Sequence, residues 1–441
     1  HVGHATRRSD SVSPASERTQ MRSHKTSLVS TSLTWLLLSS GLLGACGSDS
    51  KGHNTLPDTC KPGSATALND TCDPGFTQTA PNEPRTVAVT FSGELFGVDG
   101  LPFRPVHQGD PVFIDGWDVT FDELLVVLGN FRLAEGATQS ADQSQVGKSV
   151  ATQPGPYVVD MHKPQGFVGK DGEAPAGAIF KWDVRDDGRA FDTGTRYAFS
   201  FDTLKAAYPA TQINLTPDQF ADYDLMVQRG WSKLYRGTAT YVGTGTYPDE
   251  AIQARFAALP KKVHFLFGFD DSDSHVGCVN PDFGDGEELA NRGVQPTTDG
   301  AVIAQVTMHV DHLFWDVLKE HEDVRLRFDP IAAWAPDGTS LEEPFDLSEL
   351  VDKPLAATFA DGTALPDRAP YQDVPGGYTC GGTRPCDQVT LNLNGLPVQN
   401  VTGLAGFMAF SAQSQMHMNA DGLCYDVGQH SSDPFYTPEL D

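Results

Sequence analysis

Four of the seven methionines in this chain stand beside histidines, in three segments that are far apart in the sequence. The segments are Asp160–His162 (DMH), Met308–His312 (MHVDH) and Met416–Met418 (MHM). Soft copper ions favour thioether and imidazole ligands. The pattern therefore predicts a metal site, with copper as the first candidate ion, drawn from His309, Asp311, His312, His417, Met416, Met418 and His162.

Strand alternation sharpens this prediction. If residues 301–311 form one strand, His309 and Asp311 point to the same face, whereas Met308 points to the other. In the MHM segment the two methionines share one face and His417 takes the opposite one. The alternative is that these methionines simply fill a hydrophobic core.

Two further interpretations of the function remain open. A zinc-dependent hydrolase centred on His309, Asp311 and His312 is one, because three protein ligands and an open fourth position are typical of catalytic zinc. The sequence contains no H-E-x-x-H, G-x-S-x-G, P-loop or dinucleotide-binding motif. The other interpretation is a structural or adhesive surface protein without a site.

An acidic segment between residues 270 and 288 suggests calcium as a less favoured cofactor. Its carboxylates stand at alternate positions among glycines, as calcium loops require, and the candidate ligands are Asp271, Asp273, Asp282 and Asp285. The spacing of Gly277 does not match an EF-hand. The alternative is an acidic loop kept in solution by its charge.

Residues 21–46 (MRSHKTSLVSTSLTWLLLSSGLLGAC) begin with a basic stretch, continue with an apolar run and end on small residues before Cys46. This order is typical of an exported chain's signal segment, and it resembles the lipobox of bacterial lipoproteins, in which the cysteine is acylated after cleavage. The apolar run is shorter than the roughly 20 residues that a spanning helix needs. We therefore expect residues 21–45 to be removed and Cys46 to carry lipid.

Several expectations about location follow from the anchor. Residues 1–20 precede Met21, and we interpret them as an untranslated upstream extension. The acyl chains would bind a membrane while the folded part stays in water. Because no aspartate directly follows Cys46, the resemblance to lipoproteins implies the outer membrane of a bacterial envelope.

The charge balance is strongly acidic. The formal net charge is −27, and it becomes −30 without residues 1–45, since these hold five of the 31 basic and two of the 58 acidic residues. Nucleic acid is excluded as a partner because its phosphates require a basic face. An acidic surface is compatible with cations.

Six cysteines remain beside Cys46, and an oxidising compartment would allow up to three disulfides. Spacing alone leaves 15 pairings open. Proximity favours Cys60 with Cys72 and Cys380 with Cys386, which leaves Cys278 and Cys424 as a long-range pair.

The elements predicted from pattern are mostly strands. Runs rich in β-branched and aromatic residues, bounded by Gly, Pro and Asp, predict strands over 86–91, 117–133, 157–160, 196–201, 234–241, 262–269, 301–310, 389–393 and 404–412. Helices are expected over 216–230, 248–260 and 347–351, the first because Thr216, Pro217 and Gln219 form a capping signature that Gly230 closes.

This pattern predicts a mainly β protein, an antiparallel β-sandwich with short helical insertions. Residues 46–84 are rich in Ser, Gly, Asn, Thr and Pro and are expected to form a flexible tether. Beyond the tether we expect two β-rich subdomains, 85–190 and 191–441, the second carrying the helical insertions.

One further resemblance concerns residues 119–133 (VTFDELLVVLGNFRL) and 157–160 (YVVD). Together they resemble the start of methanobactin-associated (MbnP-like) copper-binding proteins, and the likeness covers the first third of the mature chain. It implies a periplasmic, metal-associated role in an exported β-rich domain. The resulting hypothesis is a lipid-anchored extracytoplasmic binding protein with copper as its ligand.

Overall fold

Two β-sheets carry most of the fold. The computed structural model describes residues 81–107, 109–164, 166–170, 175–284, 289–318, 324–375, 389, 391 and 401–428. Within these residues, the smaller sheet has five strands in the order β14 (Met416–Met418), β12 (Val302–Met308), β1 (Val87–Ser92), β6 (Pro175–Trp182) and β5 (Gly166–Val168).

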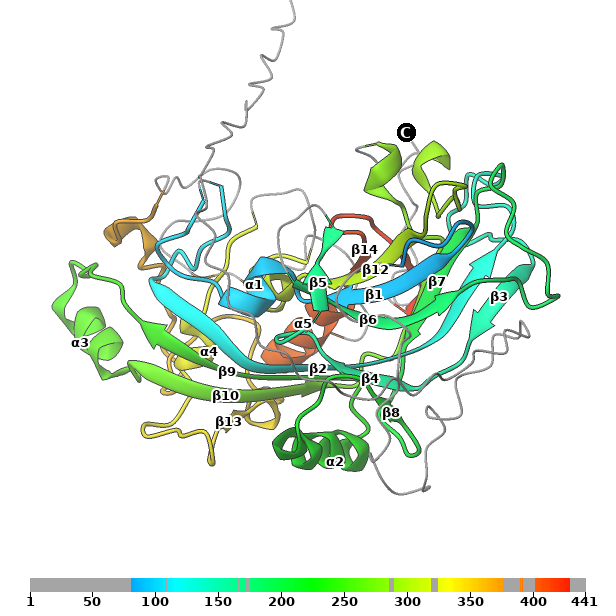
Figure 1. The fold of residues 1–441 in the computed structure, drawn as a ribbon. Coiled ribbons are helices and arrows are strands. Elements are labelled where there is room, and N and C mark those ends of the chain that lie inside the picture. The colour runs from blue at the N-terminus through cyan, green and yellow to red at the C-terminus, as the bar shows by residue number, and fades with distance from the viewer. Residues whose placement is uncertain are drawn as a thin grey trace, which may run out of the picture. The chain divides into compact units, whose positions relative to one another are not determined.

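The larger sheet has ten strands and is built around the long strand β2 (Trp117–Ala134) (Figure 1). Its main order is β13 (Phe345–Asp346), β10 (Lys262–Phe269), β9 (Lys233–Tyr241), β2, β7 (Ala198–Thr203), β11 (Ser274–Val276) and β15 (Tyr425–Asp426). In addition β3 (Ser149–Gln153) and β4 (Tyr157–Asp160) pair with β2, and β8 (Thr211–Gln212) pairs with β4.

The predicted mainly β, sandwich-like fold is confirmed. Most strand pairs are antiparallel, but β1–β12, β10–β13 and β4–β8 are parallel, so both sheets are mixed. The register of β1 on β12 runs from Val87 opposite Val302 to Ser92 opposite Thr307. This pairing joins residues on either side of position 190, as does the pairing of β2 with β9.

Helices are few and short among the described residues. They are α1 (Glu94–Asp99), α2 (Phe220–Arg229), α3 (Glu250–Ala258), α4 (Asp329–Ala332) and α5 (Gly403–Gln413), with a 3-10 turn η7 at Leu347–Leu350. The predicted start of α2 is confirmed, because Thr216 and Gln219 form a capping box in the preceding turn η3 (Pro217–Gln219). Its predicted end is confirmed as well, since Gly230 adopts the left-handed conformation with φ of 69°.

The prediction of a strand over 404–412 is wrong, because this segment lies in helix α5. Its sequence, LAGFMAFSA, contains no β-branched residue and is rich in Ala, Leu and Met, which favour helices. The segment is also buried on most sides, so its apolar run lacks the polar stripe that usually marks a helix. Val389 and Leu391 are the described part of the other late strand prediction, whose remaining residues lie outside the described ranges.

The core combines both sheets with α5. Val89 and Phe91 of β1, Val126 of β2 and Phe407 of α5 belong to one continuous buried hydrophobic cluster. A second cluster packs Tyr223 of α2 against the opposite face of the large sheet, where Figure 1 shows this helix. No helix within the described part of the chain is long and apolar enough to cross a membrane.

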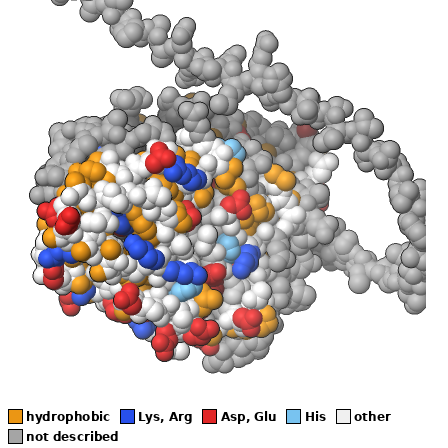
Figure 2. Space-filling model, turned by 90° about the vertical axis from the view of Figure 1, so that its left-hand side faces the viewer, with side chains coloured by type: hydrophobic (Ala, Val, Ile, Leu, Met, Phe, Trp, Pro, Cys, Tyr) orange, Lys and Arg blue, Asp and Glu red, His pale blue; other side chains and the backbone are white. Residues whose placement is uncertain are grey.

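The surface is mixed where it can be seen. On the face shown in Figure 2, acidic, basic and apolar side chains are interspersed. The predicted signal, the tether, Cys46 and the cysteines at 60, 72, 380 and 386 all lie outside the described residues. Cys278 and Cys424 form a disulfide, which is the long-range pair left over after pairing by proximity.

Candidate metal centre

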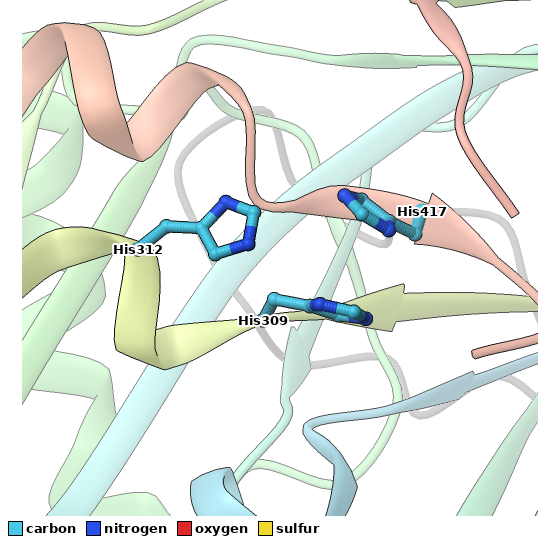
Figure 3. Close-up of side chains that lie close together, drawn as sticks. All are labelled: His309, His312 and His417. Atoms are coloured by element: carbon cyan, nitrogen blue, oxygen red, sulfur yellow. The ribbon is translucent and has the colours of Figure 1, made fainter. Parts of the chain in front are cut away.

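Strand β12 and strand β14 bring three histidines together. His309 directly follows β12, His312 lies in the next turn, η6 (Val310–Phe314), and His417 is the middle residue of β14. Thr307 stands opposite His417 in the antiparallel register, so residue 309 reaches the same face of the sheet two positions further on. Figure 3 shows the three side chains gathered at this junction.

The geometry of the three rings suits a shared ion. One possible ligand atom from each histidine lies within 4.8 Å of those of the other two. The rings of His309 and His417 stack at 4.0 Å between centroids, and the ring of His312 stands steeply to both. No other group of three metal-binding side chains at such distances occurs in the described ranges.

The three histidines differ in exposure and charge. His312 and His417 are each 2% exposed, whereas the side chain of His309 retains 14%. Burial, together with the neighbouring His309, lowers the pKa of His312 and of His417 well below the usual value. Two neutral imidazoles with available lone pairs result, which is the form that binds metals.

His309 has the opposite electrostatic environment. Burial alone would lower its pKa, but Glu94, Asp311 and Asp421 raise it to about 9. The Nε2 atom lies 3.3 Å from Glu94 Oε2 and 3.3 Å from the carbonyl oxygen of Ala420. A metal ion would therefore replace a proton on His309.

One nitrogen of the group has no hydrogen-bond partner. Nδ1 of His417 is buried and finds no donor or acceptor among the described residues. Leaving a buried polar atom without a partner costs about 1–3 kcal/mol. A bound ion would satisfy this atom.

Backbone strain is concentrated around the histidines. Five non-glycine residues of the described chain have positive φ, and three of them, Glu94, Asn419 and Ala420, lie beside this group. Asn419 is fixed by Gln305, whose N–H donates to its Oδ1 at 2.8 Å. Backbone conformations of this kind cost about 1–3 kcal/mol each and persist only where the surrounding structure enforces them. They cluster at functional sites.

The other predicted ligands lie outside the group. Strand β12 ends at Met308, so Asp311 lies in the turn η6 and its carboxylate accepts a hydrogen bond from Trp315 Nε1 at 3.2 Å. Met416 and Met418 are buried in the hydrophobic core, on the strand face opposite His417, as alternation predicted. A ring nitrogen of His162 instead contacts the carbonyl oxygen of Gly97 at 2.8 Å.

The predicted calcium ligands are engaged elsewhere. Asp271 forms a fully buried ion pair with Lys233 at 2.7 Å, and Asp282 pairs with Lys170 at 2.5 Å. Asp273 accepts the backbone N–H of Ser274 at 2.6 Å. Asp285 lies outside the described residues.

Sequence reasoning missed Glu94 and Ser414 as neighbours of the histidines. Glu94 begins α1 and reaches the site through tertiary packing. Ser414, at the C-terminal end of α5, contacts His417 three residues on, but it reaches His312 only in the folded chain. No local motif marked either residue. No protein-family model, curated protein or solved structure matches this chain, so the functional argument depends on the site itself.

Proposed function

We propose that this protein is a lipid-anchored protein of the bacterial envelope that binds copper through His309, His312 and His417. The observation that carries the proposal is the convergence of three imidazoles from two distant segments, residues 309–312 and strand β14, one of them with a buried and unpartnered nitrogen. Imidazole is a good ligand for copper, and copper(II) binds nitrogen sites more tightly than the other divalent first-row metals. The proposal now rests on imidazole, because the methionine side chains adjacent to these histidines point into the core.

The surrounding charge supports a cation. Helix α5 ends at Gln413, and the carbonyl oxygen of its C-cap residue Ser414 lies 3.0 Å from Nε2 of His417. The C-terminal end of a helix carries partial negative charge and stabilises nearby cations. Glu94 adds a carboxylate next to His309.

A zinc-dependent hydrolase is the second candidate. It is supported by the size of the group, because within the described residues the ligand set ends at three histidines and leaves a fourth position for water. Three histidines and a water form one established catalytic zinc site. In this case the ligand set would be His309, His312 and His417, with Asp311 held by Trp315.

Metal analysis of protein purified from bacterial membranes in detergent, without chelator, tests the proposal. We expect about one copper per chain, and loss of this copper in His309→Ala, His312→Ala and His417→Ala variants. His107→Ala is the matched control, because the side chain of this histidine is 66% exposed and its ring lies 3.6 Å from Asp110, so the variant should retain copper. Zinc lost together with a hydrolytic activity would favour the second candidate, and a chain that takes up neither metal would overturn both.

The anchor has its own test. A Cys46→Ala variant should remain unprocessed or be released from the membrane fraction, while the wild type should carry acyl chains on residue 46 by mass spectrometry. An unmodified cysteine in the mature wild-type protein would refute the proposed location without affecting the metal site.

A further inference from the structure

Ser414 contacts two of the three histidines. It lies between α5 and β14 and caps the helix. Its hydroxyl oxygen lies 2.9 Å from Nδ1 of His312, and its carbonyl oxygen lies 3.0 Å from Nε2 of His417. One residue thus faces one nitrogen on each of two candidate ligands.

The donor and the acceptor in each of these hydrogen bonds follow from which of the groups carries a hydrogen. A carbonyl oxygen only accepts, so Nε2 of His417 carries the proton and donates it to Ser414. The Ser414 hydroxyl donates its single hydrogen to the carbonyl oxygen of Ser411 at 2.9 Å. The hydroxyl oxygen can then only accept, so Nδ1 of His312 carries a proton as well.

These assignments determine which nitrogens remain for a metal. His312 is left with the lone pair of Nε2 and His417 with that of Nδ1, the atom that is buried without a partner. For His309, Nε2 faces the Ala420 carbonyl and the Glu94 carboxylate, which leaves Nδ1. Such outer hydrogen bonds fix the tautomer and orientation of ligand histidines.

The position of Ser414 is itself held from both sides. Nζ of the buried Lys233 donates to the carbonyl oxygen of Ala412 at 2.6 Å. On the other side, the backbone N–H of His309 donates to the carbonyl oxygen of Gln415 at 2.9 Å. The turn that carries Ser414 is therefore tied to strand β9 and to the end of β12.

We infer that Ser414 is a positioning residue, which sets the tautomer of His312 through its hydroxyl and that of His417 through its carbonyl group. The inference rests on the proposed metal site for its purpose, but the tautomers exist in the metal-free protein. The two ideas can therefore fail separately. The hydroxyl is removable by substitution and the carbonyl is not, so His417 provides an internal control.

Long-range ¹⁵N NMR of the metal-free, ¹⁵N-histidine-labelled protein at pH 7.5 tests the inference. The wild type should show His312 protonated at Nδ1 and His417 protonated at Nε2. In Ser414→Ala, His312 should become a mixture of tautomers while His417 stays unchanged, and Ser414→Thr should restore the single tautomer. A wild-type His312 protonated at Nε2 would overturn the inference without any variant.

Copper affinity provides the second measurement. Removing an outer hydrogen bond to a ligand histidine weakens metal binding about 10- to 100-fold, so we expect that loss in Ser414→Ala and near wild-type binding in Ser414→Thr. Unchanged affinity in Ser414→Ala would contradict the positioning role. If the tautomers are as expected but no metal binds, the proposed function fails and the assignment of Ser414 stands.

Discussion

Two buried polar regions of this protein differ in how their groups are paired. The first is the histidine group of His309, His312 and His417. The second, which we call the aspartate–arginine cluster, contains Asp115, Asp316, Asp329, Asp367, Arg327 and Arg368, each at most 4% exposed. The histidine group contains two neutral rings, whereas most charges of the cluster are neutralised by ion pairs.

The pairing in the aspartate–arginine cluster is extensive. Arg327 donates to Asp316 at 2.9 Å and to both oxygens of Asp367 at 3.0 and 3.1 Å. Arg368 donates to Asp329 at 2.8 Å, and Trp117 Nε1 donates to the same carboxylate at 2.8 Å. These bonds connect Asp316, Arg327 and Asp329 with β2 and with residues 367–368.

The comparison shows how to distinguish a structural polar cluster from a binding site. Buried charges are tolerated when paired partners and hydrogen bonds offset their desolvation. The cluster meets this condition largely with its own side chains, although Asp115 Oδ1 is buried without a hydrogen-bond partner just as Nδ1 of His417 is. The histidine group differs in that its rings gather possible ligand atoms within 4.8 Å and that two of the rings are neutral. Three non-glycine residues with positive φ also lie beside it, which suits a group completed by an ion.

The largest effect is expected from breaking the cluster. Arg327→Met would leave Asp316 and Asp367 without their main buried partner, which should cost about 3–5 kcal/mol of unfolding free energy. Urea denaturation measures this loss. Arg104→Ala is the control, because its pair with Asp373 is exposed and should contribute about 1 kcal/mol or less. A loss below 1 kcal/mol for Arg327→Met would show that the cluster is not structural.

The histidine group, unlike the aspartate–arginine cluster, should stabilise the fold only when a metal ion is bound. Copper at a free concentration of 100 times Kd should stabilise the wild type by about 2.7 kcal/mol. His417→Ala should lose this copper-dependent increment, whereas without metal it should lose only the packing and the hydrogen bond of one buried neutral ring, since no buried charge is left unpaired. Thermal unfolding with and without copper gives both values. If copper stabilises His417→Ala as much as the wild type, His417 is not a ligand.

A pH dependence is expected from Asp115. Burial, reinforced by Asp329, raises the pKa of Asp115 to about 8, from 3.8 in the unfolded chain. At this residue the folded protein therefore binds about one proton more than the unfolded chain between about pH 4 and pH 8. Stability from this residue is present at low pH and is lost as the pH rises, with a slope approaching about 1.4 kcal/mol per pH unit.

Asp115→Asn removes this titration while retaining an oxygen for the N–H groups of Phe328 and Asp329, which donate to Asp115 Oδ2 at 2.8 Å. The difference in unfolding free energy between the variant and the wild type should grow in favour of the variant from pH 5 to pH 8. A constant difference over this range would mean that Asp115 is ionised in the folded protein.

The smallest effect concerns the strained turn beside the histidines. Ala420 has φ of 70°, which costs an alanine roughly 1–2 kcal/mol relative to a right-handed conformation. Ala420→Gly should relieve this strain. Because glycine also has more conformational freedom in the unfolded chain, which opposes folding, the net rise in the free energy of unfolding should be at most about 1 kcal/mol. Ala254→Gly is the matched control at an exposed position in the middle of helix α3, where the same change should destabilise by about 1 kcal/mol. A loss of stability in Ala420→Gly would contradict the strain.

Local sequence pattern determined many of the elements of this protein. Runs of β-branched and aromatic residues predicted β1, β2, β4, β9 and β10 within a few residues, because such side chains suit a pleated surface that is buried on one face or, as in β1 and β4, on both. Capping residues marked both ends of α2. The pattern failed at α5, since a helix buried on most sides has no polar face to distinguish its apolar run from a buried strand.

Only the tertiary structure decided how the site is assembled. Alternation separated His417 from its two methionines, but the pairing of β14 with β12 brought it to His309, which lies 108 residues earlier in the chain. The packing of α1 brought Glu94 to His309, and the packing of α5 brought Ser414 to His312. Strand register and helix docking depend on contacts between distant segments, so residues that carry no local signal acquire their roles only when the chain is folded.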